Sequence, residues 1–99
     1  MYVANTNTQG KKDDTGKVRL DLIDPSFIEG VGKVLTFGAE KYGANNWQKV
    51  ENAKDRYYAA ALRHLLAWRK GEVVDEESGM SHLDHVATNI MFLCWLEEN

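Results

Sequence analysis

The sequence of 99 residues has only one cysteine, Cys94, and only one proline, Pro25. A single cysteine excludes a disulfide framework within the chain and a zinc site built from several cysteines, and it fits a reducing cytoplasm. The longest unbroken apolar run, Ile90 to Leu96, has seven residues, whereas a helix that spans a bilayer needs about 20. The segment from Met1 to Gly10 is polar and lacks the apolar stretch of a signal peptide. These absences predict a soluble cytoplasmic protein with no membrane partner.

Positive charge is also scarce, because 12 Lys and Arg residues stand against 15 Asp and Glu residues and give a net charge of −3. A protein that binds the backbone of a nucleic-acid duplex needs a basic face, so we expect no such partner. The phosphate loops GxxxxGK(S/T) and GxGxxG are absent, and so are the GxSxG and HExxH motifs. P-loop and Rossmann nucleotide sites are therefore excluded.

The chain does have an ordinary globular composition, with 43% apolar and 27% charged residues. Its length allows only one domain. Residues 1–14 are rich in Asn, Thr, Gly and Lys and lack periodicity, so we expect a mobile tail there and a single helical domain over residues 15–99. Partial alternation of apolar and charged residues from Val18 to Ile23 leaves a short extended segment open.

Apolar residues then recur at helical spacing in three stretches, which predicts an all-α bundle of three main helices after an irregular or extended N-terminal segment. Asp24 caps the first helix, Pro25 suits its first position, and Gly43 and Gly71 stop the first and second helices. The predicted helices run from Pro25 to Tyr42, from about Ala53 to Lys70, and from Met80 or Ser81 to about Glu97.

The third predicted helix is apolar on nearly every side from Ile90 to Leu96. Two other helices in so short a chain cannot cover all of these side chains. We therefore expect a homodimer or a homotetramer in which helices pack across the subunit interface.

Polar residues that can carry chemistry gather at the end of the first predicted helix and inside the second. Glu40 lies beside Lys41 and Tyr42 and is followed closely by Trp47. In the second helix, His64 interrupts an apolar stretch and shares its stripe with alanines, which leave room for a ligand or for another helix.

His82, His85 and Asn89 are separated by three and four residues, so they project from one face of the third helix. Two histidines at this spacing can chelate one metal ion or donate hydrogen bonds to phosphate oxygens. The competing interpretation is a polar first turn, capped by Ser81, in which both histidines face water. The choice between these alternatives stays open at the level of the sequence.

The loop before this helix holds four carboxylates within six residues: Glu72, Asp75, Glu76 and Glu77. Hard divalent cations such as Mg²⁺ take carboxylate oxygens and water, so the loop can donate metal ligands. An acidic loop is equally typical of solvated surface.

Five longer motifs follow one another along the chain: KxRxDLI (17–23), FGAEKYGxxNW (37–47), RHLxA (63–67), GExxDxESG (71–79) and HLxH followed by a helix that contains FL (82–93). With these motifs the chain resembles a phage family of dATP/dGTP diphosphohydrolase-like domains, which is related to the all-α nucleoside triphosphate pyrophosphohydrolases of the MazG type. The resemblance covers more than three quarters of the chain.

The resemblance implies an oligomeric helical fold and the cleavage of a purine deoxynucleoside triphosphate to monophosphate and pyrophosphate, with Mg²⁺ or Mn²⁺ as cofactor, in the cytoplasm of an infected host. A bound metal ion would bridge the phosphates and lower the pKa of an attacking water. Candidate metal ligands are Glu40, Asp75 and Glu77, and candidate catalytic residues are Glu40, His82 and His85. Candidate nucleotide-binding residues have cationic, imidazole, aromatic or amide side chains: Lys17, Arg19, Lys41, Tyr42, Asn46, Trp47, Arg63, His64 and Asn89.

Two other functions compete with this enzyme. The MazG pattern has an ExxE pair, whereas Glu40 has Phe37 and Gly43 three residues to either side. The incomplete pattern favours an oligomeric binding protein, or sponge, that sequesters a nucleotide-derived signal without hydrolysing it. The third alternative is a structural adaptor that uses the apolar surface of the last helix and binds no nucleotide.

Overall fold

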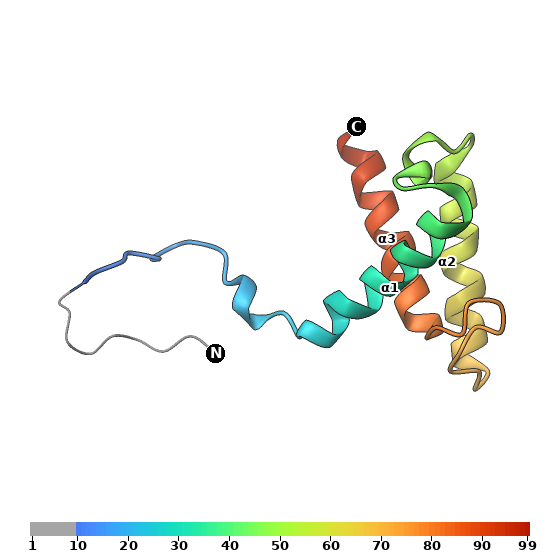
Figure 1. The fold of residues 1–99 in the computed structure, drawn as a ribbon, viewed down its shortest axis with the longest axis horizontal. Coiled ribbons are helices and arrows are strands. Elements are labelled where there is room, and N and C mark those ends of the chain that lie inside the picture. The colour runs from blue at the N-terminus through green and yellow to red at the C-terminus, as the bar shows by residue number, and fades with distance from the viewer. Residues whose placement is uncertain (1–9) are drawn as a thin grey trace.

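The computed structural model describes residues 10–99 and contains three α-helices joined by loops (Figure 1). The helices are α1 (Pro25–Tyr42), α2 (Ala53–Arg69) and α3 (His82–Glu98), and two short 3-10 turns, η1 (Leu20–Leu22) and η2 (Asn46–Lys49), precede α1 and α2. Over residues 10–99 there is no β-sheet, only one isolated antiparallel bridge. The predicted all-α fold with three main helices is confirmed.

Local capping explains where α1 and α3 begin. The carboxylate of Asp24 accepts a hydrogen bond from the backbone N–H of Ser26 at 3.4 Å, and the Ser81 hydroxyl accepts one from the N–H of Leu83 at 3.2 Å. Gly43, with φ of 95°, follows the last residue of α1. Such caps satisfy backbone groups that a helix end leaves without partners, so these boundaries follow from the sequence itself.

The N-terminal arm, residues 10–24, leads away from the helices in Figure 1. Where the sequence left an extended segment open, the structure has η1, whose turn is closed by hydrogen bonds from Leu22 N–H to the carbonyl of Arg19 and from Ile23 N–H to that of Leu20. The expected tail over residues 1–14 lies mostly outside the described residues; residues 10–14 are exposed.

Helices α2 and α3 run side by side in opposite directions, and α1 packs across α3 (Figure 1). The contact between α1 and α3 depends on Gly30, where a side-chain carbon would overlap the carboxylate of Asp84. Glycine therefore lets α1 approach the first turn of α3 closely. This contact fixes the orientation of α1 relative to α3 and so the position of the C-terminal residues of α1.

The centre of the bundle is polar. Among the described residues, Val34 and Ala61 are the buried apolar side chains, whereas His82, His85, Thr88 and Asn89 are all buried. The radius of gyration is 17.9 Å, against about 13 Å for a compact domain of this length. Many apolar side chains on the arm and on α2 are correspondingly exposed: Val18, Leu20, Leu22, Tyr58, Leu62, Leu65 and Leu66. In the described part of the chain, none of the helices has both the length and the apolarity to cross a membrane.

Candidate functional site

The loop between α2 and α3 folds back on itself before α3 begins. Val74 forms the isolated bridge with Ser81, and the N–H of Asp75 donates to the carbonyl of Met80 at 2.8 Å. This closure turns Asp75 and Ser78 toward α3 and leaves Glu77 exposed. The acidic loop thus has one inward-facing carboxylate, Asp75, and an otherwise solvated surface, and the donation of metal ligands by the loop stays a prediction.

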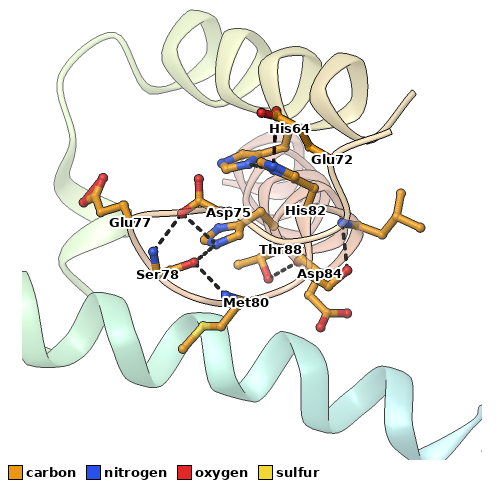
Figure 2. A network of polar contacts seen from close by, with 12 residues as sticks. His64, Glu72, Asp75, Glu77, Ser78, Met80, His82, Asp84 and Thr88 are labelled. Atoms are coloured by element: carbon orange, nitrogen blue, oxygen red, sulfur yellow. Dashed lines mark hydrogen bonds and ion pairs between the residues drawn. The ribbon is translucent and has the colours of Figure 1, made fainter. Parts of the chain in front are cut away.

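Three histidines meet where this loop joins the two long helices; we call His64, His82 and His85 the histidine cluster. The Nδ1 atoms of His64 and His82 lie 2.8 Å apart (Figure 2). The rings of His64 and His85 stack with their centroids 4.3 Å apart and their planes within 7°. His82 and His85 do share one face of α3, but that face is turned inward. The side chain that completes the cluster, His64, comes from α2.

Each histidine on α3 also faces a polar side chain of the loop. His85 Nε2 lies 2.7 Å from the Ser78 hydroxyl oxygen and 4.0 Å from a carboxylate oxygen of Asp75. His82 Nε2 lies 3.9 Å from a carboxylate oxygen of Glu72. Within the described residues, every buried side-chain nitrogen and oxygen atom has a hydrogen-bond partner. The cluster is therefore a closed polar network, as buried polar groups require.

Burial controls the ionisation of this network. Removal from water, together with the charge of neighbouring histidines, lowers the pKa of His64 below its ordinary value. Burial also lowers the pKa of His85, and it outweighs the nearby Asp75 carboxylate. For Asp75, burial alone would raise the pKa, but hydrogen bonds from Ser78 and the histidine charges together lower it. At neutral pH the site thus pairs a carboxylate with neutral imidazoles at His64 and His85.

A cleft of about 1020 Å³ lies beside the cluster, between the C-terminal half of α1, the η2 connection and the facing sides of α2 and α3. It is lined by six of the nine predicted nucleotide-binding residues, Lys41, Tyr42, Asn46, Trp47, Arg63 and Asn89, and also by His85. His85 is the member of the histidine cluster that forms part of the cleft wall. The structure therefore brings together most of the residues that the sequence singled out.

Aromatic packing anchors one side of this cleft. Trp47 stacks on Phe92 with ring centroids 4.5 Å apart and meets Trp95 edge-on at 5.1 Å. The Tyr57 hydroxyl donates a hydrogen bond to the backbone carbonyl of Trp47 at 2.7 Å. The sequence analysis did not select Tyr57 or Phe92, although aromatic residues on adjacent helices are a usable signal for such a cluster. Tyr42, by contrast, is 64% exposed.

Several predicted residues lie elsewhere. Lys17 and Arg19 lie on the N-terminal arm, where Arg19 pairs with Asp21 at 2.8 Å, and neither lines the cleft. His64 contacts the other histidines behind the cleft wall. Glu40 lies on another side of α1, in a hollow of about 420 Å³ that it shares with Lys33.

The predicted carboxylate ligands are not assembled at one point. Among residues 10–99, the one group of three or more potential ligands whose donor atoms all lie within 4.8 Å of one another is His64, Asp75 and His82. Glu77 is instead paired with Lys41, and this ion pair raises the pKa of the lysine. A set made of Glu40, Asp75 and Glu77 does not fit this arrangement, because each carboxylate has a different environment.

Comparison with known proteins shows which family the sequence matches. Residues 7–99 match a family model described as dATP/dGTP diphosphohydrolase, N-terminal. A protein of Salmonella phage PMBT28 named dATP/dGTP diphosphohydrolase is 45% identical over 92 residues, which cover 91% of this chain and 30% of that protein. The chain thus spans less than a third of the length of this relative. No solved structure matches the chain.

Proposed function

Because the chain belongs to the family of dATP/dGTP diphosphohydrolase N-terminal domains, we propose that it binds a purine deoxynucleoside triphosphate and hydrolyses it. The products would be a monophosphate and pyrophosphate, and the reaction would take place in the host cytoplasm during phage infection. The sequence motifs predicted this family, and the match over residues 7–99 confirms that membership.

The observation that carries the proposal is the chemistry of the cleft. Arg63 and Lys41 supply positive charge for phosphate oxygens. The exposed ring of Tyr42 offers a surface for stacking a base, and Asn46 offers an amide that can read the edge of a base. The volume of about 1020 Å³ is of the size expected for a small-molecule site. These side chains gather within one cleft, and the sequence contains neither of the Gly-rich phosphate loops GxxxxGK(S/T) and GxGxxG.

Within this cleft we assign His85 the role of proton acceptor. Its imidazole lines the wall, and its lowered pKa keeps it neutral and able to take a proton from an attacking water. This role requires the tautomer in which Nε2–H donates to the Ser78 hydroxyl oxygen, because Nδ1 then has the free lone pair that accepts the proton. His82 lies behind the wall against His64, so its part is to position the cluster.

We propose that Mg²⁺ or Mn²⁺ enters with the triphosphate as part of the substrate. The carboxylates predicted as its ligands are separated, and Glu77 is occupied by Lys41, so no catalytic step is assigned here to an ion held by this chain.

We also propose that the chain forms a homodimer or homotetramer. The support is the apolar surface of α2 and of the arm that the chain leaves exposed, together with Ile90 of α3, which is 48% exposed. Light scattering at micromolar concentration should report a multiple of the chain mass of 11.2 kDa, and a monomeric mass would refute this part of the proposal.

Nucleotide binding without hydrolysis is the second candidate. Two observations favour it: the carboxylate set is not assembled, and the chain spans only 30% of the length of its hydrolase relative. A sponge would need the same cleft but no proton acceptor and no metal ligands.

The test combines calorimetric titration with dATP and dGTP in the presence of Mg²⁺ and chromatography of the products. We expect binding and release of pyrophosphate by the wild type, and binding at least about tenfold weaker in Arg63→Ala. Lys33→Ala is the matched control, because it removes a cation of α1 that lies outside the cleft. Binding without products would favour the sponge, and the absence of binding would refute both candidates.

A further inference from the structure

One arrangement in the histidine cluster has the composition of a transition-metal site. His64 comes from α2, Asp75 from the loop and His82 from the start of α3, and one donor atom from each lies within 4.8 Å of the others. We propose that His64 Nδ1, His82 Nδ1 and the Asp75 carboxylate bind one divalent transition-metal ion that prefers octahedral coordination, such as Mn²⁺, Fe²⁺ or Co²⁺. This site differs from the carboxylate set predicted from the sequence, and it does not depend on nucleotide binding.

The distance between the two imidazole nitrogens indicates the coordination geometry. The two Nδ1 atoms lie 2.8 Å apart. With the zinc–nitrogen bond of about 2.0–2.1 Å, ligands at right angles are separated by about 2.9 Å and tetrahedral ligands by about 3.3 Å, and the longer bonds of Mn²⁺ widen both separations. The observed spacing is therefore closer to two adjacent octahedral positions than to two tetrahedral ones, and the nitrogens must move slightly apart when an ion binds. Two imidazoles and one carboxylate on one side of an octahedral ion leave three positions open to water or to phosphate oxygens.

Neighbouring side chains hold the three donors in the way that outer ligands of metal sites commonly do. His82 turns Nδ1 toward His64 and Nε2 toward Glu72, whose carboxylate oxygen lies at 3.9 Å. The N–H of Ser78 donates to the Asp75 carboxylate at 2.9 Å (Figure 2). The ring of His85 stacks against that of His64. A carboxylate that accepts a hydrogen bond from a ligating histidine fixes its tautomer and makes the free nitrogen a better ligand. At 3.9 Å the Glu72 carboxylate makes no hydrogen bond to His82, but a small movement of this exposed side chain brings it within reach of Nε2–H when Nδ1 binds an ion.

The choice of donors also selects the class of ion. Imidazole nitrogens suit first-row transition metals, whereas Mg²⁺ prefers oxygen ligands and keeps much of its water. An ion at this point would join α2, the loop and α3 by three bonds, and these are the elements that form the polar centre of the bundle. Binding should consequently raise the stability of the folded chain as the ion concentration rises.

The competing explanation is a direct hydrogen bond between His64 and His82, with one nitrogen protonated and the other not. Calorimetry on tag-free, EDTA-treated protein, with MnCl₂, CoCl₂ and MgCl₂ titrated in turn, distinguishes the two. We expect one Mn²⁺ or Co²⁺ ion per chain, a rise in Tm with either ion, and no comparable effect of Mg²⁺. The weak visible absorption of six-coordinate Co²⁺ should accompany saturation. A wild type that binds neither Mn²⁺ nor Co²⁺ would overturn the proposal and leave the hydrogen bond as the sole interaction.

Variants then locate the ion. His64→Gln and Asp75→Asn should abolish the one-to-one binding, and Glu72→Gln should weaken it about tenfold, as loss of an outer partner does. Because Glu72 is exposed, its variant tests the site even if the histidine variants unfold. The matched controls are Glu76→Gln, which removes an exposed carboxylate of the same loop, and Cys94→Ser, which removes the exposed thiol. Equal affinity in the wild type, Asp75→Asn and Glu72→Gln would place the ion elsewhere and refute the assignment.

Discussion

The histidine cluster and the cleft share the wall formed by α3, but they are built in opposite ways. In the cluster, His82 and His85 are buried, and each of their polar contacts is made within the chain. In the cleft, Lys41 and Arg63 are exposed, and Arg63 has no ion pair among the described residues. One region is satisfied without a ligand, whereas the other displays charge that a ligand can neutralise.

Because of this difference, the cluster contributes mainly to the free energy of folding and the cleft mainly to the free energy of ligand binding. Buried polar groups that are fully paired contribute to folding, because removal of one partner leaves the other unsatisfied in a dry environment. Exposed cations contribute little to folding and much more to the binding of an anion. Substitutions in the cluster should therefore change stability first, and substitutions in the cleft should change nucleotide affinity first.

The largest expected effect comes from His85→Ala. The substitution removes a buried ring that stacks on His64, and it leaves the Ser78 hydroxyl with the N–H of Met80 as its remaining partner. We expect the free energy of unfolding to fall by about 2–3 kcal/mol. Urea denaturation measured by circular dichroism checks this value. Arg63→Ala should stay within about 0.5 kcal/mol of the wild type, and comparable losses in both variants would remove the distinction between the regions.

A smaller effect is expected at the contact that places α1. Gly30→Ala should lower the free energy of unfolding by about 1 kcal/mol, because the added carbon meets the Asp84 carboxylate. Gly32→Ala is the matched control on the same helix, since nothing lies near its added carbon, and it should stabilise the chain by up to about 1 kcal/mol. In an Asp84→Ala background, Gly30→Ala should become neutral or stabilising. An unchanged loss there would contradict the contact.

Low pH and high pH should reduce the stability of the fold through different residues. The pKa values of His64 and His85 are lowered by burial, so the unfolded chain takes up protons first as the pH falls below about 6.5. The stability that these histidines contribute is complete above that pH and is lost as the pH falls through their folded pKa values. Tyr57, beside the cleft, has a pKa raised by burial, so its contribution is complete below about pH 10 and is lost above it.

Thermal unfolding in EDTA, measured from acid to alkaline pH, checks the predicted loss of stability on each side. His64→Gln should flatten the acid side of the stability profile, and Tyr57→Phe should flatten the alkaline side. If His64→Gln leaves the acid side unchanged, His64 does not contribute to it, and His85 and the carboxylates are responsible.

The ends of the helices could be predicted closely because a capped helix end depends on residues that lie next to it in the sequence. Asp24 and Ser81 cap the N–H groups that follow them, and Gly43 ends α1, so each boundary depends on a few consecutive positions. The alanines next to His64 also indicated close approach of a second helix, and Ala61 is indeed buried.

The assembly of the sites could not be predicted in the same way, because it depends on how distant residues are rotated. His64 and His82 are 18 positions apart, and their contact follows from the face that α2 turns toward α3. Glu40 is only one residue from Lys41, yet one helical position moves a side chain about 100° around α1, and only Lys41 lines the cleft. Adjacency in the sequence therefore does not by itself place two residues of a helix in one site.

The smallest expected effect is on nucleotide affinity in Glu77→Gln, and it distinguishes a metal ligand from an ion-pair partner of Lys41. If Glu77 were a metal ligand, as the sequence pattern predicts, Glu77→Gln would weaken binding of a deoxynucleoside triphosphate with Mg²⁺. In the structure its carboxylate is paired with Lys41, so the substitution frees a cation at the edge of the cleft and removes a negative charge near the phosphates. We therefore expect binding to become about twofold tighter at low salt, with the gain disappearing in high salt because exposed charges are screened. Glu76→Gln makes the same change of charge at the neighbouring exposed position, so a larger gain in Glu77→Gln than in Glu76→Gln measures the release of Lys41 itself. Equal gains would reduce the effect to net charge, and weaker binding in Glu77→Gln would restore this carboxylate as a ligand.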